Sequence, residues 1–79
     1  MAKLTIKQKV ILEAIEWYIQ QFGISPTIQD LAELTNTSTH PTPEKVKKLE
    51  ELGVISTQNG KARTIKVLIS LEEIENAEH

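Results

Sequence analysis

Residues 38–53, with the sequence STHPTPEKVKKLEELG, most constrain what this chain can fold into. The second half of this segment has helical periodicity, with apolar residues at three-residue spacing: Val46, Leu49 and Leu52. Thr42 followed by Pro43 predicts an N-cap and a first helical position, and Gly53 predicts a left-handed C-cap. The segment is therefore predicted to contain a capped amphipathic helix whose lysines face away from the core.

The entrance to this helix is rich in hydrogen-bonding side chains: Ser38, Thr39, His40 and Thr42. Backbone N–H groups at a helix N-terminus favour a phosphate, and short polar side chains there can reach a base edge. For this helix alone, the alternative is a capped surface helix that lies on a small core, because such helices are common. The elements around it are needed to choose between the two interpretations.

Two further helices are predicted upstream, each opened by a capping-box pattern between a threonine and a residue three positions later. Thr5 opens the first, which spans residues 5–23. Its apolar residues recur every three or four positions and are predicted to enter the core, with Trp17 at the edge: Ile11, Leu12, Ile15, Tyr18, Ile19 and Phe22. Thr27, with Asp30, opens the second, which is predicted to end at about Leu34.

The second helix, the polar turn at residues 35–37 and the third helix form a helix-turn-helix pattern, which by itself is a weak signal. After Gly53 the periodicity becomes extended. Asn59-Gly60, between residues 54–57 and 62–69, is the strongest short-range hairpin signal that a sequence offers. Three helices followed by a two-stranded hairpin predict a mainly α fold with a small β-hairpin, the three-helix winged helix-turn-helix.

The net charge of −2 over 79 residues argues against a nucleic-acid ligand until it is divided along the chain. Residues 1–35 carry −1, residues 36–66 carry +3 and residues 67–79 carry −4. Positive charge is therefore concentrated in the third helix and the hairpin, where a local field acts on an approaching polyanion. Residues 1–69 are predicted to form one winged-helix domain. Residues 70–79 are predicted to be an acidic C-terminal tail or linker, with one amphipathic turn or none.

The composition excludes several function classes. Without cysteine there is no thiolate zinc site, and His40 and His79 have no partner at ligand spacing, so no metal or other cofactor is predicted. Without a Ser-His-Asp set or a glycine-rich phosphate loop, the chain is predicted not to be an enzyme and to have no small-molecule substrate. No apolar run is long enough to span a membrane and no signal peptide is present, so a cytoplasmic protein is predicted.

Three stretches of sequence follow one another between residues 4 and 68: L-T-x-K-Q-x-x-x-L, G-I-S-P-T-I-Q-D-L-A-E and K-x-L-E-E-L-G-V-I-S-T-Q-N-G-K-A-R-T-I-K-V-L. This order resembles the N-terminal DNA-binding domain of LexA repressors. The most specific parts are G-x-x-P-T, L-A, L-x-x-L-G-V-I and a glycine-tipped hairpin that ends in R-x-I-K. The resemblance implies a winged helix that binds operator DNA as a dimer and represses transcription. Its second helix-turn-helix helix would enter the major groove, and its wing would touch the DNA backbone.

The chain departs from the family pattern in two places. The family has Ser-Pro-Asn where the recognition helix starts; here Ser38 is kept, but His40, Pro41 and Pro43 follow. Because proline disfavours helical backbone at the residue before it, the helix is expected to begin at Pro43, a turn late, with base contacts unlike the family's. The chain also stops where the family has a linker and a self-cleaving peptidase domain, so no autoproteolysis is assigned.

Three elements are predicted to bind DNA in this interpretation. The third helix and its entrance are predicted to lie over the major groove and its flanking phosphates: Ser38, Thr39, His40, Thr42, Lys45 and Lys48. The wing is predicted to follow the adjacent backbone or minor groove: Asn59, Lys61 and Arg63. Thr27 is predicted to bind a phosphate at the N-terminus of the second helix. For the histidine, and for the two wing cations, a solvated surface side chain is the alternative.

The predicted partner is double-stranded DNA. One copy of this size would bind a single half-site weakly, so either a homodimer on a symmetric operator or a separate dimerising element is expected. The competing prediction is a winged helix that serves as a protein–protein interaction module and does not bind DNA. The two prolines and the overall acidity favour this alternative, whereas the basic stretch at residues 45–66 opposes it.

Overall fold

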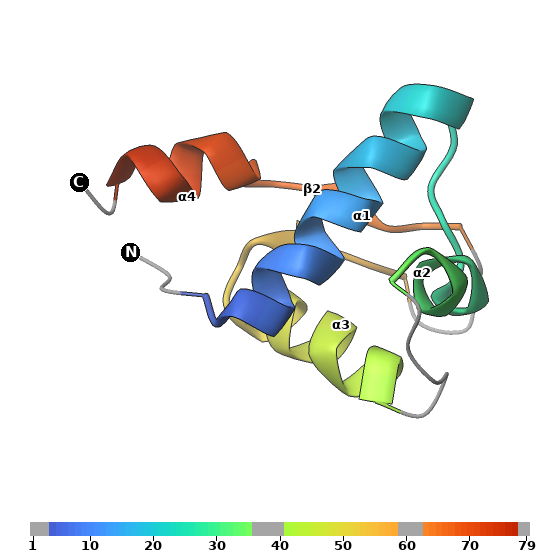
Figure 1. Cartoon of the computed structure of the whole chain (residues 1–79), viewed down its shortest axis with the longest axis horizontal. Helices are drawn as coiled ribbons and strands as arrows, with labels where there is room; N and C mark the ends of the chain where they lie inside the picture. Colours follow the sequence, from blue (N-terminus) through green and yellow to red (C-terminus); the bar gives the residue numbers. More distant parts are fainter. Residues whose placement is uncertain (1–3, 36–40, 59–62, 78–79) are drawn as a thin grey trace.

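The structure is a computed structural model, and it describes residues 4–35, 41–58 and 63–77 (Figure 1). The elements follow in the order helix α1 (Ile6–Phe22), helix α2 (Ile28–Leu34), helix α3 (Pro41–Glu51), strand β1 (Ile55–Ser56), strand β2 (Lys66–Val67) and helix α4 (Leu71–Ala77). Helices α1, α2 and α3 pack against one another, β1 and β2 pair antiparallel, and α4 contacts α1. This is the winged helix-turn-helix architecture that the sequence predicts. Within the described ranges, no helix is long and apolar enough to cross a membrane.

Local hydrogen bonds fix both ends of α1. The Thr5 N–H donates to Gln8 Oε1 over 2.9 Å, and the Gln8 N–H donates to Thr5 Oγ1 over 3.1 Å, which completes the predicted capping box. At the other end, Gly23 has a φ of 71°, and its N–H donates to the Ile19 carbonyl over 2.8 Å. Glycine adopts this left-handed conformation readily because it has no Cβ. The first predicted helix is therefore confirmed at both ends.

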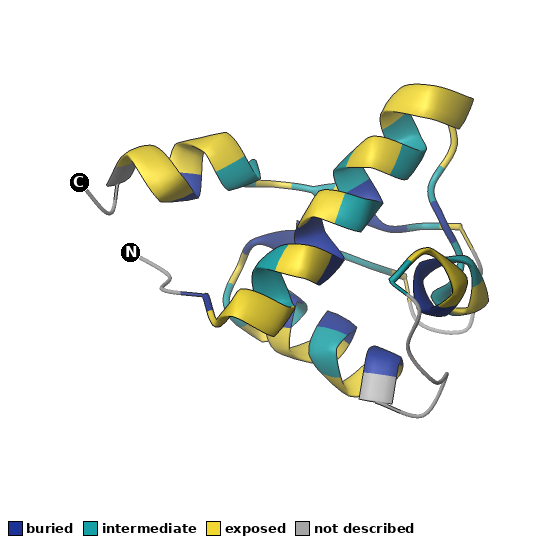
Figure 2. Ribbon diagram, viewed as in Figure 1, coloured by how far each residue is buried: buried dark blue, intermediate teal, exposed yellow. Residues whose placement is uncertain are grey.

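The hydrophobic core lies between the middle of α1, α2, α3 and the hairpin (Figure 2). Its buried members come from every described element except the strand β2: Leu4, Ile11, Leu12, Ile15, Leu31, Val46, Leu49, Val54, Ile55, Ile65 and Ile74. Phe22, which was predicted for the core, is 59% exposed. The last turn of α1 projects beyond the elements that cover its middle (Figure 1). The Phe22 ring instead lies against Tyr18, with ring centroids 4.6 Å apart.

Helix α3 begins at Pro41, so the predicted start at Pro43 is wrong. The two prolines occupy the first and third positions of the helix. The N–H groups of the first turn have no acceptor within the helix. A proline in this turn, which has no backbone N–H, therefore loses no intrahelical hydrogen bond. Pro43 also disfavours helical backbone at the residue before it, which is Thr42. Thr42 is fully buried, and its packing in the first turn outweighs this preference.

The hairpin pairs Ile55 with Val67 and Ser56 with Lys66. This register leaves residues 57–65 to connect the strands, a longer connection than the two residues of an Asn-Gly turn. The predicted alternation along the second strand is confirmed, because Ile65 is buried whereas Lys66 is exposed. We call β1, β2 and the residues that connect them the wing; its predicted Asn59-Gly60 tip lies outside the described residues.

Helix α4 packs on α1, which decides between the two possibilities that the sequence left open. The Leu71 N–H donates to Glu16 Oε2 over 3.1 Å, and the Glu73 N–H donates to Ser70 Oγ over 3.2 Å. Ile74 is 3% exposed and belongs to the core. Residues 71–77 therefore form an amphipathic helix, in spite of their acidic composition.

Candidate nucleic-acid interface

Helix α3 has one apolar and one polar side. Thr42, Val46 and Leu49 are buried, and their spacing of four and then three residues places them on one side of the helix. The opposite side is exposed: Pro43, Glu44, Lys47, Lys48 and Glu51. The side of α3 that a DNA groove can meet is therefore polar and carries both signs of charge.

Thr42, which was predicted to contact DNA, has a fully buried side chain. The physical reason is the earlier start of α3. With the helix beginning at Pro41, residue 42 lies one turn before Val46 on the core side. The side chain that was predicted to read a base is thus part of the interior of the domain.

Replacing Thr42 with alanine is expected to lower the free energy of unfolding by about 1–3 kcal/mol, because a buried polar side chain and its interactions are lost. The preferred DNA sequence is expected to stay the same. Urea unfolding measures the first effect, and selection of binding sites from a duplex library measures the second. A changed sequence preference at unchanged stability would mean that this side chain reaches the bases after all.

The lysines of α3 differ in their surroundings. Lys47 and Lys48 are exposed, and Lys48 Nζ lies 3.9 Å from Glu51 Oε2, with both side chains 56% exposed. An exposed pair of this kind is weak, so Lys48 can exchange its carboxylate for a phosphate at little cost. Lys45 is half-buried. Five other residues with predicted DNA contacts lie outside the described residues: Ser38, Thr39, His40, Asn59 and Lys61.

The N-terminus of α2 has the predicted capping box between Asp30 and Thr27, the residue that was also predicted to bind a phosphate. The Thr27 N–H donates to Asp30 Oδ2 over 2.9 Å, and the Asp30 N–H donates to Thr27 Oγ1 over 3.0 Å. The hydrogen bond from the Thr27 backbone is the main cause that lowers the pKa of the Asp30 carboxyl below its ordinary value. The Asp30 carboxylate therefore satisfies the N–H of the N-cap residue.

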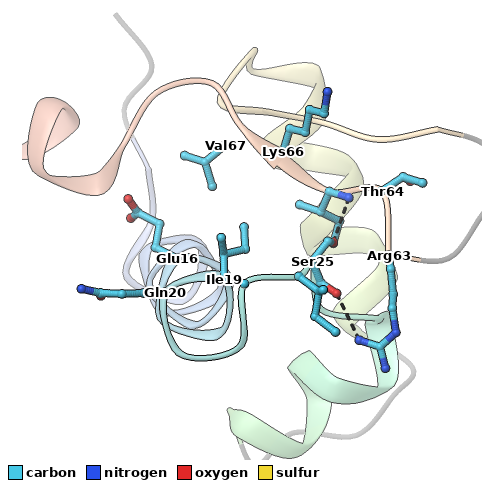
Figure 3. A pocket seen from close by; sticks show the side chains of 11 residues that line it. Glu16, Ile19, Gln20, Ser25, Arg63, Thr64, Lys66 and Val67 are labelled. Atoms are coloured by element: carbon cyan, nitrogen blue, oxygen red, sulfur yellow. Dashed lines mark hydrogen bonds between the residues drawn. The ribbon is translucent and has the colours of Figure 1, made fainter.

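The side chain of Arg63, which was predicted to contact DNA from the wing, turns toward the body of the domain (Figure 3). Its Nη1 lies 3.2 Å from the Tyr18 hydroxyl, 3.2 Å from the Ser25 carbonyl and 3.3 Å from Asp30 Oδ2. The hydrogen bond with Tyr18 is the main cause that raises the pKa of Arg63 above its ordinary value. In Figure 3 the Lys66 side chain extends in the opposite direction, so these two cations do not share one patch.

The hydrogen bonds of Ser25 are a second feature that sequence reasoning missed. Ser25 Oγ accepts from the Ile65 N–H over 2.9 Å and donates to the Pro26 carbonyl over 3.1 Å. We call β1 and the residue after it the first arm of the wing, and residues 63–67 the second arm. The connector between α1 and α2 is thereby joined to the second arm. Next to this junction, a groove of about 720 Å³ lies between α1 and β2 (Figure 3). The one signal in the sequence is that G-x-x-P-T and R-x-I-K, which meet here, were both specific parts of the resemblance.

Comparisons with known proteins bear on this arrangement. Residues 1–64 match the family model described as the LexA DNA binding domain. The chain is 36% identical over 74 residues to the LexA repressor of Thermosipho melanesiensis. The aligned region covers 94% of the chain and 37% of that repressor. It is 34% identical over 74 residues to the LexA repressor of Methylococcus capsulatus. That aligned region covers 92% of the chain and 37% of the repressor. The chain thus spans a little over a third of the length of these relatives.

Proposed function

Because the chain belongs to the LexA DNA-binding domain family, we propose that it binds double-stranded DNA sequence-specifically and represses transcription. The observation that carries this proposal is the family match over residues 1–64, which covers α1, α2 and α3 and extends into the wing. In this proposal the chain acts by occupying DNA in the cytoplasm and catalyses no reaction. The match gives no support to a protein-interaction module.

The exposed side of α3 is the part of the domain that would face the major groove, and the wing would lie over the adjacent backbone. Lys47 and Lys48 project from that side and supply charge for phosphates. The segment before α3, with Ser38, Thr39 and His40, would reach base edges. Thr42, which is buried, has no part in this contact.

A symmetric DNA site occupied by two copies follows from the same proposal. One domain of 79 residues covers a single half-site, and two-fold symmetric proteins read palindromic sequences with half-sites about one helical turn apart.

The proposal is tested by removing one charge from α3 and, for comparison, one from α1. Lys48→Gln is expected to weaken binding to all duplex sequences alike and to reduce the slope of log K against log salt by about 1. Lys7→Gln removes the same charge from an exposed position near the start of α1 and is expected to leave the slope unchanged. Equal slopes for Lys48→Gln and the wild-type chain would place α3 away from the phosphates.

A further inference from the structure

We infer that Arg63 is a positioning residue for DNA binding: it anchors the second arm of the wing to the N-terminal end of α2 and acts on DNA through the wing alone. This inference rests on the proposed DNA binding. It assigns to Arg63 a role other than the direct DNA contact that the sequence predicted.

The contacts of Arg63 join the wing to three other parts of the domain. Its Nη1 reaches the Tyr18 hydroxyl on α1, the Ser25 carbonyl in the connector and the Asp30 carboxylate on α2. Asp30 is itself held by the Thr27 N–H at the start of α2. One guanidinium nitrogen therefore ties the wing to the first helix of the helix-turn-helix, through hydrogen bonds to two oxygens and an ion pair with Asp30.

The backbone of Arg63 supports this role independently of the side chain. Its φ of 57° makes it the one non-glycine residue with a positive φ within the described residues. An arginine in this region is uncommon, and it persists where the surrounding structure determines it. Two residues later, the Ile65 N–H donates to Ser25 Oγ over 2.9 Å. The second arm is thus held by both its side chain and its backbone.

The first arm of the wing is tied to the other helix of the helix-turn-helix. Just after β1, Thr57 donates from its N–H and from its hydroxyl to Glu50 Oε2 on α3. One arm is therefore bound to α3 and the other to α2, each through a carboxylate of that helix. The position of the wing relative to α3, which decides whether both can meet one duplex, depends on these two attachments.

Asp30→Asn distinguishes a positioning role from a direct phosphate contact, because the two roles predict opposite changes in DNA affinity. If Arg63 positions the wing, loss of the Asp30 charge loosens the anchor and weakens DNA binding. If Arg63 bound a phosphate directly, removal of a competing carboxylate 3.3 Å away would strengthen binding. The asparagine keeps an oxygen that can accept from the Thr27 N–H, so the cap of α2 is disturbed little.

The experiment measures affinity for a random-sequence duplex by fluorescence anisotropy, at a temperature where circular dichroism shows each variant to be folded. Arg63→Gln and Asp30→Asn are each expected to weaken binding about fivefold to tenfold, and the double variant no more than Arg63→Gln alone. Arg63→Lys should restore part of the affinity, because it keeps the charge for Asp30, but its flexible ammonium does not hold the fixed position of the guanidinium. Glu72→Gln, which removes an exposed carboxylate from α4, is the matched control and should leave binding unchanged.

Three results would overturn the inference. Tighter binding by Asp30→Asn, together with a smaller salt slope for Arg63→Gln, would show direct contact between Arg63 and DNA. Wild-type affinity in both single variants would show that the anchor does not matter for DNA, while the proposed function would stand. Absence of binding by the wild-type chain would remove the proposed function and this inference with it.

Discussion

Replacement of Leu49 with alanine is expected to lower the free energy of unfolding by about 2–5 kcal/mol. Leu49 is fully buried on the core side of α3, so its removal leaves a cavity where α3 packs on α1. A domain of this size has a total stability of only about 5 kcal/mol, which this loss nearly exhausts. Most of the DNA affinity should be lost along with the fold.

The control for this prediction is Leu68→Ala, the same chemical change at a leucine that is 57% exposed. It is expected to change the free energy of unfolding by less than about 1 kcal/mol, because an exposed side chain leaves no cavity. Urea unfolding followed by circular dichroism measures both variants. Equal stability of the two would contradict the placement of α3 on the core.

The parts of the fold that the sequence predicts are those set by neighbouring residues. Thr5 and Thr27 each meet a partner three residues later, and both capping boxes form as predicted. The wing is predicted because an alternating apolar pattern places Ile65 on the helices. These signals are local, so they can be read without knowing which elements meet.

The start of α3 is a local feature that sequence reasoning placed two residues late. The conformational preference of a residue before proline is a modest bias, and a buried side chain in the first turn outweighs it. Because Thr42 was assigned to the N-cap, its side chain was expected outside the helix and near DNA. The earlier start at Pro41 reverses that orientation.

The anchor of Arg63 is invisible in the sequence for a different reason. Arg63 lies 45 positions after Tyr18 and 38 after Ser25, and only the packed fold brings them together. A basic residue after a hairpin tip has the same local pattern whether it meets a phosphate or a carboxylate. The local sequence therefore gives its charge correctly but not the group that it binds.

DNA affinity is expected to fall on the order of a hundredfold between roughly 50 mM and 200 mM salt, if about four phosphates are contacted. Each phosphate that a lysine neutralises releases a condensed counterion, and higher salt opposes that release. Lys47 and Lys48 would supply two such contacts, and Lys45 and Lys61, which the sequence predicts to bind DNA, would supply two more. The effect arises although the chain as a whole carries a charge of −2, because a local field governs the contact.

The most direct test of the account is one titration of a labelled random-sequence duplex with the wild-type chain at these two salt concentrations. We expect saturable binding at the lower concentration and a loss of affinity of about two orders of magnitude at the higher one. Absent binding at low salt, or an affinity that salt leaves unchanged, would contradict the proposal that this winged helix binds DNA.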